Sequence, residues 1–76
     1  MAIKPANPDR VIETLTRLGF RIVRRKGSHV VLKHPDGRIT VVPVHPGEAI
    51  GRGLLAKIIR DTGLTREEFL KALREV

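Results

Sequence analysis

The chain has 76 residues, no cysteine and a formal net charge of +7 at pH 7. This length fits one domain over residues 1–76, and the lack of cysteine excludes disulfides and thiolate zinc sites. No apolar run reaches the roughly 18 residues of a membrane span, and the first ten residues lack the apolar segment of a signal peptide. We therefore expect a soluble, cytoplasmic protein with no membrane contact, no metal and no small-molecule cofactor.

The positive charge is unevenly distributed. Fifteen Lys and Arg stand against eight Asp and Glu, and residues 15–35 hold six of the cations with no acidic residue. Segregated positive charge points to a polyanion, with nucleic acid as the first candidate. Phe20 and Phe69 are the only aromatic residues and fall at apolar-periodic positions. Contacts with the sugar–phosphate backbone are therefore favoured over base stacking.

The first half of the chain predicts a helix followed by three strands. Asn7 is a helix-capping residue and Gly19 a stop signal, which gives a helix over Pro8–Leu18. Short turns then join three strands into an antiparallel meander. The strands are Phe20–Arg25, His29–His34 and Arg38–Val42, and the turns are Lys26–Ser28 and Pro35–Gly37.

The second half predicts a loop and two helices. A loop over Val44–Gly53 precedes a helix that carries Leu55 and Ile58 and ends at Gly63. A capping box, in which Thr65 and Glu68 satisfy free amides, begins a short last helix. The fold class is therefore α+β, with the order α-β-β-β-α and a short extra C-terminal helix. The helices cover one face of a three-stranded antiparallel sheet.

Strand alternation predicts which side chains face the helices. The apolar set Phe20, Ile22, Val30, Leu32, Ile39 and Val41 is expected to face inward. The opposite face is then expected to carry Arg21, Val23, Arg25, His29, Val31, Lys33, Arg38, Thr40 and Val42. This interpretation places His29 on an open face that is rich in cations.

Four short motifs follow one another along the chain in an order that is typical of one protein family. They are Gly27-Ser28-His29, His34-Pro35, Val42-Pro43-Val44-His45, and a final Leu-x-x-Ile pattern from Leu55 to Leu64. Together they resemble the HicA (YcfA-like) toxins of toxin–antitoxin systems, over about Pro8 to Leu70. The resemblance implies a fold similar to the double-stranded RNA-binding domain, metal-independent cleavage of mRNA, and inhibition by a HicB-like antitoxin that covers the active face. It also implies that His29 is catalytic. Val30 and Val31 depart from the pattern, since many relatives carry a second histidine or an aromatic residue there.

The chemistry of the residues is compatible with this resemblance. Histidine exchanges protons near neutral pH, and RNA supplies its own nucleophile, the 2′-OH. The predicted RNA contacts are Arg21, Arg25, Lys26, Gly27, Ser28, Lys33 and Arg38. The second proton-transfer group is left open between water, Ser28 and a lysine. His34 and His45 are expected to have structural or neutral roles.

The sequence is also compatible with two other functions. A non-catalytic RNA-binding module with the same fold would use His29 only for backbone contacts. A DNA-binding regulator is less favoured, because the helix over Arg52–Gly63 has an apolar stripe and few groups for base edges. Val23, Val31 and Val42 are predicted to form an apolar row on the cationic face that binds the antitoxin. Ordinary strand propensity would also account for these valines.

Overall fold

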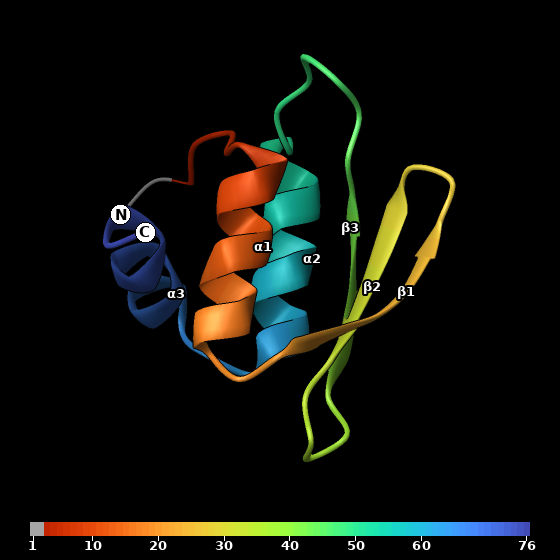
Figure 1. The fold of residues 1–76 in the computed structure, drawn as a ribbon. Helices are drawn as coiled ribbons and strands as arrows, with labels where there is room; N and C mark the ends of the chain where they lie inside the picture. Colours follow the sequence, from red (N-terminus) through yellow and green to blue (C-terminus); the bar gives the residue numbers. More distant parts are fainter. Residues whose placement is uncertain (1–2) are drawn as a thin grey trace.

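Six elements follow one another in the predicted order in a computed structural model that describes residues 3–76 (Figure 1). They are α1 (Pro8–Arg17), β1 (Arg21–Lys26), β2 (His29–Lys33), β3 (Ile39–Pro43), α2 (Arg52–Thr62) and α3 (Arg66–Arg74). The strands form one antiparallel sheet in the order β1-β2-β3. The α+β class and the arrangement similar to a double-stranded RNA-binding domain are therefore confirmed.

The helix boundaries follow from local capping. Asn7 Oδ1 accepts the N–H of Asp9 at 2.8 Å at the start of α1. Thr65 and Glu68 exchange side chain–backbone hydrogen bonds of 2.9 and 3.1 Å at the start of α3, which confirms the capping box. Gly63 ends α2 in the left-handed region, with φ of +75°, where a residue without Cβ is favoured.

One hydrophobic core lies between the helices and the sheet. Figure 1 shows α1 and α2 standing side by side on one side of the sheet, with α3 beyond α1. α2 packs against β3, α1 packs against β3 and β1, and α3 packs against the other two helices. The core side chains are Val11, Leu15, Phe20, Val30, Leu32, Val42, Ile50, Leu55, Ile58, Ile59 and Phe69. Within residues 3–76 no helix is long and apolar enough to cross a membrane.

Strand β2 follows the predicted alternation. Val30 and Leu32 are buried, whereas His29 and Lys33 are exposed and Val31 is half-buried. The outward orientation of His29 is confirmed. We call the sheet face that bears His29, Val31 and Lys33, away from the helices, the outer face.

Strand β3 has the opposite alternation to the prediction. Thr40 and Val42 are buried, whereas Ile39 and Val41 are 53% and 37% exposed. The reason is the register, because directly opposed residues share a face. Val42 lies opposite Val30, and Thr40 lies opposite Leu32. The buried Thr40 hydroxyl donates to Asp61 Oδ2 at 2.9 Å, so the core accommodates it.

Strand β1 contains a β-bulge that the sequence did not predict. Ile22 lies opposite Leu32, but the next pair joins Arg24 to Val31, so Val23 is an extra residue. The shift places Arg25 opposite the inward-facing Val30. The predicted position of Arg25 on the outer face is therefore wrong. Phe20, expected to begin this strand, precedes it as a buried residue of the connection.

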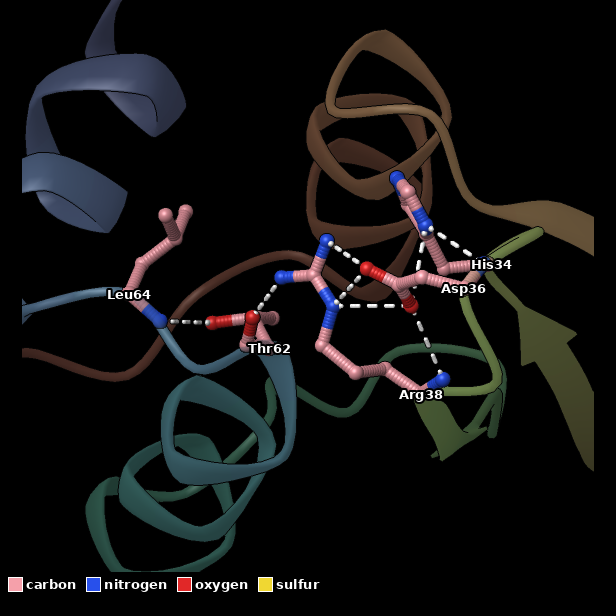
Figure 2. A network of polar contacts seen from close by, with 5 residues as sticks. All are labelled: His34, Asp36, Arg38, Thr62 and Leu64. Atoms are coloured by element: carbon pink, nitrogen blue, oxygen red, sulfur yellow. Dashed lines mark hydrogen bonds and ion pairs between the residues drawn. The ribbon is translucent and has the colours of Figure 1, made fainter.

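The turn between β2 and β3 is fastened to the end of α2 by Arg38 (Figure 2). The guanidinium donates to Asp36 through Nε, at 3.1 and 2.9 Å, and its Nη2 forms an ion pair with Asp36 Oδ2 at 2.8 Å. Its Nη1 donates to the carbonyl of Thr62. The side-chain hydrogen bond from Arg38 is the main cause that lowers the pKa of Asp36 to about 2. Arg38 thus connects two parts of the fold that are distant in sequence.

His34 completes this network on the side of β1. Its Nδ1 accepts the N–H of Asp36 at 3.2 Å and lies 3.0 Å from Asp36 Oδ1. The ring packs edge-on against Phe20, with centroids 5.2 Å apart. A Cβ added to Gly19 would meet His34 Nε2 at 2.8 Å, so only glycine fits there without displacing the ring. These contacts give His34 a part in holding the turn against Phe20.

We predict that Asp36→Asn destabilises the fold in a pH-dependent way. The folded pKa of Asp36, about 2, lies below its ordinary value of 3.8. The carboxylate therefore stabilises the fold above that ordinary value, and the contribution is lost as the pH falls through 2. In thermal melts the variant should unfold a few degrees below the wild type at neutral pH, with the gap closing near pH 2. Glu48→Gln, at an exposed carboxylate, is the control. A gap that persists at pH 2 would contradict the prediction.

Candidate functional site

A two-residue turn positions the start of β2. Lys26 lies opposite His29, so Gly27 and Ser28 alone connect the strands. Gly27 has φ of +59°, and no non-glycine residue of the described part of the chain, including Ser28, has positive φ, a pattern that fits a type II′ hairpin turn. The Ser28 carbonyl accepts the N–H of Val44 at 2.6 Å. This bond holds the turn against the end of β3 and fixes where His29 begins its strand.

His29 lines a shallow depression of about 460 Å³ on the sheet. The depression is formed by Arg24, Lys26, Gly27, Ser28, His29 and Val31. The imidazole is exposed, and within residues 3–76 it makes no hydrogen bond or ion pair. Its nitrogens are therefore available to a bound molecule, with two cationic side chains beside them.

The outer face has positive charge and no acidic residue. Arg21 lies opposite Lys33, Arg24 opposite Val31, and Lys26 opposite His29, so these cations share a face. No Asp or Glu falls within the three strands. Within residues 3–76 none of the four cations has a hydrogen-bond acceptor or carboxylate partner. An anionic ligand is the partner that this surface best accommodates.

Two of the predicted RNA contacts are placed differently. Arg25 lies opposite inward-facing Val30. It is nevertheless exposed, as is every other residue of β1. Arg38 is half-buried and already bound to Asp36 and Thr62, with its guanidinium 5.4 Å from the Phe20 ring centroid. The structure therefore separates Arg38 from the depression and gives it a part in the fold.

The predicted apolar row is only partly present. Val23 is 56% exposed and Val31 is half-buried on the outer face, but Val42 has no exposed surface. The position predicted for Val42 is wrong, and in this fold its side chain offers nothing to an antitoxin. Val41 takes its place, because it lies opposite Val31 and is exposed. Ile39 extends the exposed apolar surface along β3.

Sequence reasoning missed three residues of the outer face, Arg24, Ile39 and Val41. Val41 could have been found from the tight turn, because pairing His34 with Arg38 also pairs Val31 with Val41. The His34 N–H indeed donates to the Arg38 carbonyl at 2.8 Å. Arg24 had no such signal, since nothing in the local sequence marks Val23 as a bulge. Among the described residues, 3–76, no group of three or more His, Asp or Glu side chains could hold a metal ion.

Comparison with known proteins identifies the family. A search of curated proteins gave no match. A family model described as the HicA toxin of bacterial toxin–antitoxin systems matches residues 8–64. The match covers the chain from the start of α1 to the residue after the α2 stop. It therefore includes all three strands and the depression at His29. The chain belongs to the HicA toxin family of bacterial toxin–antitoxin systems.

Proposed function

We propose that this chain is an endoribonuclease toxin that cleaves mRNA, with His29 as its catalytic residue. Toxins of the HicA family are mRNA interferases, and family membership implies an antitoxin partner. The observation that carries the proposal is the position of His29. It is an exposed imidazole without a partner among residues 3–76, in a depression that it shares with Arg24 and Lys26.

In the proposed reaction the RNA supplies the nucleophile. His29 takes the proton of a ribose 2′-OH, and the 2′-oxygen attacks the adjacent phosphorus. The bond between phosphorus and the 5′-oxygen breaks, and that oxygen gains a proton from water, Ser28 or a lysine. The products are a 2′,3′-cyclic phosphate and a 5′-hydroxyl. Arg24 and Lys26 stabilise the negative charge on the phosphoryl oxygens. Because His29 accepts the proton of the nucleophile and cationic side chains stabilise the charge, the proposed reaction needs no metal ion.

The second candidate is an RNA-binding module that does not cleave. The same cationic outer face would bind the RNA backbone, and His29 would only contact it. The two functions predict different results when the imidazole of His29 is removed. A nuclease loses its activity, whereas a binding module keeps most of its affinity.

We predict that His29→Ala abolishes cleavage and keeps the fold. The imidazole is exposed, so its loss leaves no cavity. Loss of general acid–base catalysis should lower the cleavage rate by at least about 100-fold. Cleavage of a labelled RNA in buffer with EDTA measures the rate, and a thermal melt verifies folding. A folded variant that cleaves at the wild-type rate would remove His29 from the mechanism. An inactive wild type that still binds RNA would favour the binding module.

We further predict that Arg24 contributes more to cleavage than Arg25. The bulge puts Arg24 in the depression, whereas Arg25 lies opposite inward-facing Val30. Arg24→Gln should lower kcat/KM about tenfold, as expected for one lost charged hydrogen bond. Arg25→Gln has the same change in net charge and is the matched control. Equal losses in both variants would mean that only the overall charge of β1 matters.

The antitoxin is proposed to bind the outer face. Its apolar groups would cover Val23, Val31 and Val41, and its acidic groups would meet Lys33 and the arginines of β1. Exposed valines beside a cationic depression suit a protein partner better than they suit RNA. A HicB-like antitoxin bound there would cover His29, so substrate and inhibitor would compete for one surface.

We predict that Val41→Asp weakens the antitoxin complex and leaves the fold intact. The side chain is 37% exposed, so the change should cost the fold about 1 kcal/mol or less. A titration with the antitoxin should show at least about tenfold weaker binding, since a buried carboxylate at an apolar contact is costly. Leu54→Asp, at an exposed position of α2, is the control. Unchanged affinity would move the antitoxin site to the helical side, around Leu73.

A further inference from the structure

A second cationic pair lies at the opposite end of the outer face from His29. Arg21 and Lys33 are directly opposed in the register, and both side chains are exposed. A shallow depression of about 320 Å³ lies at this pair, lined by Arg21, Val23, Lys33, His34 and Pro35. Within residues 3–76 neither Arg21 nor Lys33 has a hydrogen-bond or ion-pair partner.

This arrangement works against the stability of the sheet. Like charges directly opposite one another on a sheet are destabilising. The neighbouring Arg38 shows the contrasting case, because Asp36 neutralises it through three contacts of 2.8 to 3.1 Å. Among the residues that the structure describes, no carboxylate forms an ion pair with Arg21 or Lys33. An anion bound between the two side chains would remove the repulsion and satisfy both donors.

The pair is too far from His29 to act on the same phosphate. Lys33 is four residues along β2 from His29, which is about 13 Å at the rise of a strand. The two ends share the outer face, and Val31 lies between them on the same strand. One strand of RNA running along β2 would therefore meet cations at both ends and an apolar strip in the middle.

We propose that Arg21 and Lys33 form a second phosphate-binding subsite for the RNA strand whose scissile linkage lies at His29. The inference rests on the proposed function, because His29 defines the first position. The subsite holds a phosphate of a neighbouring nucleotide, and the strip of Val31 and Val41 lies under the sugars between. Binding at this subsite depends on RNA length, since a short oligonucleotide cannot reach both ends.

The test is a binding series that does not depend on cleavage. Oligouridylates with 2′-O-methyl groups lack the nucleophile, so the wild-type protein leaves them intact. Their affinity is measured by fluorescence anisotropy as the chain grows one nucleotide at a time. The proteins compared are the wild type, the double variant Arg21→Gln/Lys33→Gln, and Arg60→Gln/Lys71→Gln. The last pair carries the same change in net charge on exposed positions of α2 and α3.

For the wild type we expect a step of about tenfold in affinity at the length that first spans both ends. The step should be absent in the Arg21/Lys33 double variant and kept in the helix control. A double variant that loses affinity equally at every length, or that keeps the step, would overturn the subsite. This series measures binding, whereas the role of His29 is tested by the cleavage rate of His29→Ala. The subsite can therefore be disproved while His29 is shown to be catalytic, and His29 can be shown not to be catalytic while the subsite is confirmed.

Discussion

The composition of the outer face depends on which side chains of β2 point away from the helices. β2 is the central strand, so its register with both neighbours determines which of their side chains face the helices. Burial of Val30 and Leu32 fixes that orientation, because a slip of one residue would bring His29 and Lys33 into the core. The cost of burying an unpaired lysine excludes that alternative. Hydrophobic burial on one face therefore holds the imidazole in solvent on the other.

Local signals predicted the elements well. The helix caps depend only on nearby backbone groups, so they can be predicted from a short stretch of sequence. This holds for Asn7, Gly63 and the capping box of Thr65 and Glu68. The outward orientation of His29 was also predicted correctly, although Val30 and Val31 put apolar residues at both parities of β2. The family, too, followed from the order of short motifs around Gly27-Ser28-His29, and the match over residues 8–64 confirmed it.

What the sequence could not provide was the register between strands. β3 contains apolar residues at both parities, so composition alone favoured Ile39 and Val41 for the core. Pairing with β2 instead buried Thr40, whose hydroxyl is satisfied by Asp61. The bulge at Val23 is likewise a property of two strands and not of one. It exchanged Arg25 for Arg24 on the outer face, and so changed the composition of the candidate site without changing the fold.

The distribution of acidic residues links stability to the proposed activity. Where a carboxylate is present it supports the fold, as Asp36 does at the turn and Asp61 does beside Thr40 and Lys57. The strands have none, so their cations are compensated only by a bound polyanion or an acidic protein. Either partner would add binding free energy to a small fold. Occupation of the outer face and stability of the toxin are therefore expected to rise together.

The two edges of the sheet differ in how well they resist pairing with another strand. β1 has four Arg and Lys side chains and a bulge, both of which oppose the addition of a further strand. β3 has neither: it is uncharged from Ile39 to Pro43, and its exposed side chains are apolar. Only Pro43, which has no N–H, interrupts its outer row of backbone groups. Self-association of this toxin at high concentration would therefore begin at the β3 edge, on the side of the sheet away from its arginines.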